Sequence, residues 1–126
     1  MIKQIKIGNK EYGIKSSAFT MFAYKNETGR DLLKDINEIN NIYNKIQKLP
    51  KDEQPSFWME EITGIIEKAL KLCYVMIKEY DKSFSLNYEE WLGELDNIFE
   101  DNSWIIEVVK VGTSPFQGRV SNSPNK

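Results

Sequence analysis

The feature that most constrains the fold is a long apolar stripe in the middle of the chain. Its residues recur at intervals of three and four, the spacing of one face of an α-helix, and they are Trp58, Ile62, Ile65, Ile66, Ala69, Leu72, Cys73, Met76, Ile77 and Tyr80. Charged residues such as Glu67, Lys68 and Lys71 fall mostly on the opposite face. We therefore expect residues 58–80 to form the core helix of the protein.

Residues 2–15 are predicted to form a β-hairpin. Apolar residues alternate there with lysine or glycine, which is the strand period, and they are Ile5, Ile7, Tyr12 and Ile14. Between the two runs, Gly8-Asn9-Lys10 tolerates the positive φ angles of a tight turn. Because an isolated hairpin is only marginally stable in water, its apolar face must pack on the helices or its edge must pair with a partner.

Capping residues divide the rest of the chain into helices. Ser16-Ser17 can cap a short helix that Gly29 ends, and its predicted apolar face comprises Ala18, Phe19, Phe22 and Ala23, broadened by Met21 and Tyr24. Asp31 can cap the next helix, which Pro50 ends before a polar linker at residues 51–55. A later helix is capped by Asn87.

The end of the chain is less regular. Residues 104–111 are rich in Ile and Val, so the pattern leaves open whether they form a helix or a strand. From Gly112 onward the composition cannot bury enough apolar surface to fold by itself. We expect an α+β, mainly α-helical fold, in which the N-terminal hairpin packs on a bundle of about four to five helices. Residues 1–111 would form one globular domain, and residues 112–126 a flexible, disordered tail.

Composition excludes most catalytic chemistry. The chain has no histidine, which rules out Ser-His-Asp and Cys-His catalysis and His-ligated metals. The one cysteine, Cys73, lies in the apolar stripe and behaves there as a small hydrophobe. The acidic pairs Glu60-Glu61, Glu89-Glu90 and Glu94-Asp96 are interpreted as solvated surface, and residues 89–101 lack the spacing and central glycine of an EF-hand. We predict no enzyme, and no catalytic, cofactor-binding or metal-binding residues.

Charge and hydropathy narrow the class of partner. Seventeen basic and 19 acidic residues give a net charge of -2, whereas nucleic-acid binding needs a basic excess. No apolar run approaches the roughly 20 residues that span a bilayer, and the N-terminus lacks a signal-peptide core. A lone cysteine is typical of a reducing compartment. We expect a cytoplasmic protein that binds neither nucleic acid nor membrane.

Three segments near the N-terminus form a pattern that is found in a known family, namely residues 5–19, residues 22–25, and residues 28–36 with their Gly29-Arg30-Asp31-Leu32-Leu33 run. Through these segments about a third of the chain resembles the tail assembly chaperones of long-tailed phages and prophages of low-GC Gram-positive bacteria. A further similarity lies in residues 85–95, with Tyr88, Trp91 and Leu92. The resemblance implies a protein that coats the tape measure protein, keeps it soluble, recruits tail tube subunits, and is absent from the mature virion.

Three Trp, six Tyr and six Phe suggest a protein-binding surface, because aromatic residues are enriched at interfaces. The candidate protein-binding residues are Ile5, Ile7, Trp58, Ile62, Trp91 and Trp104, with a core role for the tryptophans as the alternative. The helix 58–80 would line a groove for amphipathic helices, and the strand edge 2–7 would pair between copies. Two other functions stay open: an adaptor or regulatory protein of a mobile element that binds a host protein, and a structural head–tail connector.

Overall fold

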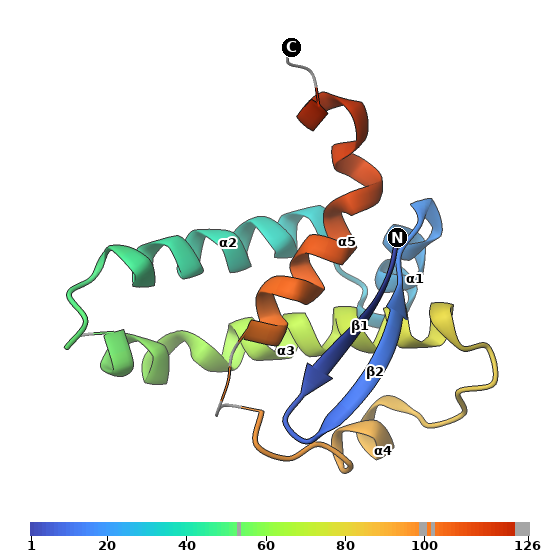
Figure 1. The fold of residues 1–126 in the computed structure, drawn as a ribbon, viewed down its shortest axis with the longest axis horizontal. Coiled ribbons are helices and arrows are strands. Elements are labelled where there is room, and N and C mark those ends of the chain that lie inside the picture. The colour runs from blue at the N-terminus through green and yellow to red at the C-terminus, as the bar shows by residue number, and fades with distance from the viewer. Residues whose placement is uncertain (53, 99–100, 102, 123–126) are drawn as a thin grey trace.

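Two strands and five helices make up the part of the chain that the structure, a computed structural model, describes (Figure 1). That part comprises residues 1–52, 54–98, 101 and 103–122, without the side chains of residues 54–62 and 117–122. In chain order the elements are β1 (Ile2–Ile7), β2 (Lys10–Lys15), α1 (Ala18–Thr28), α2 (Leu32–Lys48), α3 (Gln54–Tyr80), α4 (Tyr88–Leu92) and α5 (Ser103–Asn122). The α+β, mainly α-helical prediction with an N-terminal hairpin is confirmed.

Helix α3 is the element on which the others pack. It contacts β2, α1, α2 and α5, and Figure 1 shows α2 running alongside it while α5 crosses it. Its buried side chains between residues 65 and 77 include those of the predicted stripe, namely Ile65, Ile66, Ala69, Leu72, Cys73, Met76 and Ile77. Burial of each large aliphatic side chain contributes about 1.5–3 kcal/mol, so this stripe anchors the fold.

The hairpin is antiparallel, with Ile7 opposite Lys10, so that Gly8 and Asn9 form a two-residue turn. Gly8 has a φ of 59°, and a Cβ atom there would lie 1.7 Å from the carbonyl oxygen of Asp96. The inner face of the hairpin buries Ile5, Ile7 and Ile14. The apolar face of the hairpin therefore packs on the helices, which is one of the two arrangements expected from the sequence.

The predicted caps are confirmed. Ser17 forms a capping box with Thr20 at the start of α1, and Gly29 ends that helix in the left-handed conformation with a φ of 74°. The side chain of Asp31 accepts hydrogen bonds from two backbone N–H groups at the start of α2. Asn87 forms a second capping box, at the start of α4. Each of these signals is local in sequence.

The predicted apolar face of α1 is wrong for its two phenylalanines, although Tyr24 is buried and Met21 packs against the core. Phe19 and Phe22 are 55% and 60% exposed, whereas the residues that this helix buries are Thr20 and Tyr24. The helix is therefore rotated about its own axis so that its two phenylalanines point toward solvent. Buried polar partners on α2 and α3 account for this rotation, as described below.

The C-terminal segment also differs from the expectation. Residues 104–111 are helical, and α5 continues to Asn122, past residue 111 where the ordered domain was predicted to end. Gly112 is buried at the side chain of Leu72, and Phe116 packs against the core. These tertiary contacts hold residues that would not fold by themselves, while residues 123–126 lie outside the described part. No helix among the described residues is long and apolar enough to cross a membrane.

Candidate protein-binding surface

The N-terminal end of α1 is fastened to α3 through a buried carboxylate. Glu79, near the end of α3, is only 7% exposed. The hydroxyl of Ser17 donates a hydrogen bond to its Oε2, and the hydroxyl of Thr20 donates one to its Oε1 at 2.7 Å. A buried carboxylate is expensive unless it accepts hydrogen bonds, so Glu79 favours the rotation of α1 that turns Thr20 inward.

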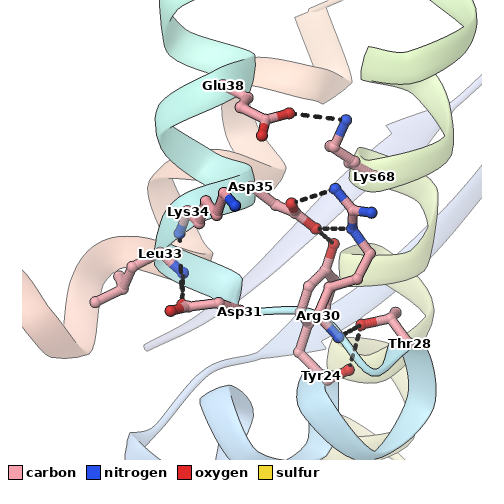
Figure 2. Close-up of polar contacts among 9 residues, drawn as sticks. All are labelled: Tyr24, Thr28, Arg30, Asp31, Leu33, Lys34, Asp35, Glu38 and Lys68. Carbon is pink, nitrogen blue, oxygen red and sulfur yellow. Dashed lines mark hydrogen bonds and ion pairs between the residues drawn. The ribbon is translucent and has the colours of Figure 1, made fainter.

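The other end of α1 is fastened to α2 through a second buried carboxylate, that of Asp35 (Figure 2). The Tyr24 hydroxyl donates to its Oδ2 at 2.6 Å. Arg30, in the connection between the helices, donates from Nε at 2.7 Å and from Nη2 at 2.8 Å. This two-pronged guanidinium–carboxylate contact is among the stronger hydrogen-bonding arrangements in proteins.

The protonation states of this cluster follow from its contacts. Burial alone would raise the pKa of Asp35, but the hydrogen bonds from Arg30 and Tyr24 outweigh it and the pKa lies below its usual value. The pKa of Tyr24 is raised by burial and by its bond to Asp35. Asp35 is thus a carboxylate and Tyr24 a phenol at neutral pH, the states that this bond requires.

With both ends of α1 held in this way, Phe19 and Phe22 are exposed. We call these two residues the aromatic face. Phe19 also borders a groove between α1, the C-terminal part of α3 and the loop after it, which we call the α1–α3 groove. The groove encloses about 370 Å³, and its apolar lining consists of Phe19, Ala23, Val75 and Phe84. Exposed aromatic residues beside an apolar groove are typical of a protein-binding surface.

Four of the predicted protein-binding residues lie in the core. Ile5, Ile7, Trp91 and Trp104 are each 4% exposed or less. Trp91 packs in an aromatic cluster with the rings of Tyr12, Tyr74 and Tyr88, and the indole Nε1 of Trp104 donates to the carbonyl of Ile98 at 3.0 Å. Burial thus accounts for all four side chains, and the surface is built from other residues.

The other two predicted residues, Trp58 and Ile62, lie on α3, but their side chains are outside the described part. Sequence reasoning assigned Phe19 to the core of α1 and so missed the aromatic face. The available signal was the i, i+4 pair Thr20 and Tyr24, which defines a polar face on the same helix. Nothing in the sequence pattern identifies Glu79 as the distant partner of that face.

The acidic residues singled out in the sequence lie at the surface wherever the structure describes their side chains. Glu89, Glu90 and Glu94 are exposed, and Glu90 accepts the backbone N–H of Asn87 in the α4 capping box at 2.9 Å. Glu60 and Glu61 lie outside the described side chains. Burial raises the pKa of the Cys73 thiol, which makes it a poor nucleophile. The described residues contain no group of three or more possible ligands for a metal ion.

Similarity to known proteins adds no further constraint on this surface. No protein-family model, no curated protein and no solved structure matches the chain.

Proposed function

We propose that the protein is a phage tail assembly chaperone that binds the tape measure protein, keeps it soluble and brings tail tube subunits to it. The observation that carries this proposal is the aromatic face of α1. Phe19 and Phe22 are large apolar side chains turned to solvent on a helix that hydrogen bonds hold at both ends. Because each side chain is already partly buried, a partner helix that covers it gains about half of the roughly 1.5–3 kcal/mol of full burial.

The resemblance to tail assembly chaperones supports the same surface. Residues 5–19, 22–25 and 28–36 carry it, and they include the aromatic face of α1 together with Tyr24, Arg30 and Asp35, which orient that helix. The part of the chain that looks like the family is therefore the part that builds the surface. A chaperone in this role acts in the host cytoplasm and is absent from the finished particle.

Self-association along the client is part of the proposal, and the edge of β1 is the place for it. Met1 and Ser16 exchange both of their backbone hydrogen bonds, so by alternation Gln4 and Lys6 direct their backbone N–H groups away from β2. A groove of about 420 Å³ runs beside this edge. Edge strands readily pair with another chain.

The test of the chaperone function is co-expression with the tape measure protein encoded in the same genome. We expect the two proteins to co-purify and the soluble fraction of the tape measure protein to increase. The variant Phe19→Ser/Phe22→Ser should lose both effects. Leu33→Ser, which replaces an exposed apolar residue on α2, is the matched control and should retain them.

Two outcomes would favour the other functions. If the unaltered chain leaves the tape measure protein insoluble and unbound, the chaperone function is rejected in favour of an adaptor that binds a host protein. If mass spectrometry finds the chain in purified phage particles at the level of a structural component, a head–tail connector is favoured instead. Gln4→Pro, which removes an outward N–H group from β1, should lower self-association measured by sedimentation while client binding by the monomer persists.

A further inference from the structure

The two walls of the α1–α3 groove carry charges of opposite sign. Lys78 and Lys82 line the side formed by α3 and the loop after it, and Glu27 lines the side formed by α1. Neither lysine forms an ion pair with a carboxylate of the described residues, and neither does Glu27 with a described cation. These three exposed charges are therefore available to a partner.

Aromatic rings position the two lysines. The Nζ atom of Lys78 lies 5.1 Å from the centre of the Tyr74 ring, and that of Lys82 lies 6.0 Å from the centre of the Phe19 ring. Such contacts attract the ammonium group without neutralising its charge. The remaining charged group of the groove, Glu79, is buried, and each of its oxygens accepts a hydrogen bond from a hydroxyl group at the start of α1.

Four of the nine residues that line the groove are apolar, namely Phe19, Ala23, Val75 and Phe84. The groove volume of about 370 Å³ falls within the roughly 300–1,000 Å³ of cavities that bind drug-sized groups, which suits a few side chains from one face of a third helix. Helices bind in such grooves through apolar anchors at i, i+3, i+4 and i+7. Charges on the rim then fix the direction in which the helix lies.

We infer that the α1–α3 groove binds an amphipathic helix whose apolar face is flanked by acidic residues on the α3 side and by basic residues on the α1 side. The identity of that helix as a segment of the tape measure protein rests on the proposed function. The charge pattern itself follows from Lys78, Lys82 and Glu27. A helix of this kind that lay in the opposite direction would bring like charges together on both walls.

The experiment uses the full chain and synthetic peptides of about 25 residues, long enough for several helical turns, that tile the tape measure protein. Fluorescence anisotropy at low salt identifies the binding peptides. We expect these to carry the acidic-flanked apolar face, and Lys78→Glu/Lys82→Glu to weaken their binding about tenfold. Lys34→Glu/Lys110→Glu, which changes two exposed lysines outside the groove by the same charge, should leave binding unchanged.

A charge exchange makes the inference specific. Peptides in which the acidic flank is replaced by lysine should bind poorly to the unaltered chain and regain affinity for Lys78→Glu/Lys82→Glu. The difference should shrink as salt is raised, because exposed charges are screened. Recovery of binding would also show that the variant is folded and that its loss of affinity has an electrostatic cause.

Each contrary result has a distinct meaning. Equal binding of the client by the unaltered chain and by Lys78→Glu/Lys82→Glu would overturn the inference and leave the proposed function intact. Absence of binding to every peptide and to the whole tape measure protein would overturn both. A change in oligomeric state caused by Lys78→Glu/Lys82→Glu, with client binding unaffected, would assign the groove to a second copy of this chain and would overturn the assignment to a client helix.

Discussion

The hairpin and helix α1 are adjacent in sequence, and both have apolar residues at regular spacing. The hairpin buries Ile5, Ile7 and Ile14 against the helices, whereas α1 exposes its two phenylalanines, Phe19 and Phe22. The difference arises because α1 carries hydroxyl groups that donate hydrogen bonds to buried carboxylates. Regular apolar spacing identifies an element, but it does not decide which face is buried when another face carries partners for buried charges.

Magnitudes favour the observed rotation of α1. Three hydroxyl groups, on Ser17, Thr20 and Tyr24, donate hydrogen bonds to the carboxylates of Glu79 and Asp35, and bonds to charged groups contribute about 1.5–3 kcal/mol each. Both phenylalanines are already more than a third buried, so burying the rest would gain less for each than the roughly 1.5–3 kcal/mol of full burial. Three such bonds outweigh two such burials, and loss of the bonds would also leave buried carboxylates without donors.

The largest change in the free energy of unfolding is expected for a substitution in the hairpin. Ile7→Ala removes a fully buried side chain and should lower the free energy of unfolding by about 2–5 kcal/mol. Urea denaturation measures the change. Ile2→Ala, on the same strand but at an exposed position, should stay within about 0.5 kcal/mol of the unaltered chain, and similar losses for both variants would refute the assigned strand register.

A smaller loss of stability is expected when Asp35, one of the carboxylates that orient α1, is replaced. Asp35→Asn keeps the shape of the side chain but removes the charge that Arg30 and Tyr24 contact, so we expect a loss of about 1.5–3 kcal/mol in the free energy of unfolding. Glu38→Gln is the control, since its ion pair with Lys68 is partly exposed and should contribute at most about 1 kcal/mol. Equal losses would contradict the role given to Asp35.

The pH dependence of stability tests the same role of Asp35. The pKa of Asp35 is lower in the folded protein than its usual value, so its contribution to stability is present above the unfolded pKa of about 3.9. That contribution is lost as the pH falls through the lower, folded pKa. The stability difference between the unaltered chain and Asp35→Asn, measured by urea denaturation from neutral to acid pH, should therefore be constant above about pH 5 and shrink below about pH 4. A constant difference down to the acid end would exclude this linkage.

The smallest effect on stability is expected on the aromatic face. Phe22→Ala removes a side chain that is 60% exposed and should change the free energy of unfolding by about 0.5 kcal/mol or less. Co-purification with the tape measure protein should nevertheless decrease. A loss as large as that of Ile7→Ala would mean that Phe22 packs in the core, and the comparison between the two elements would fail.

Local signals made much of this fold predictable. The turn at Gly8, the caps at Ser17, Asp31 and Asn87, and the left-handed Gly29 each depend on backbone groups only a few residues away. The apolar spacing of α3 likewise predicted its buried face. Such features follow from the sequence because both partners of each contact lie within one element or turn.

The candidate surface was not predictable in the same way, because its determinants are distant in sequence. The rotation of α1 depends on Glu79, which lies 59 residues beyond Thr20. The end of the ordered chain was misplaced for a related reason, since the glycine and proline after Val111 suggest a tail until Leu72 is found against Gly112. For the tryptophans the sequence leaves a binding role and a core role open, and the tertiary packing that buries Trp91 and Trp104 favours the core role for these two.

The two carboxylates that hold α1 have an evolutionary consequence. Because Glu79 and Asp35 set the rotation of the helix through Thr20 and Tyr24, the residues at positions 19 and 22 are under little selection for folding. Mutations there can be retained or lost according to the partner alone. A lineage that keeps the buried polar contacts can thus change what α1 recognises by substituting two side chains, without having to evolve a new core.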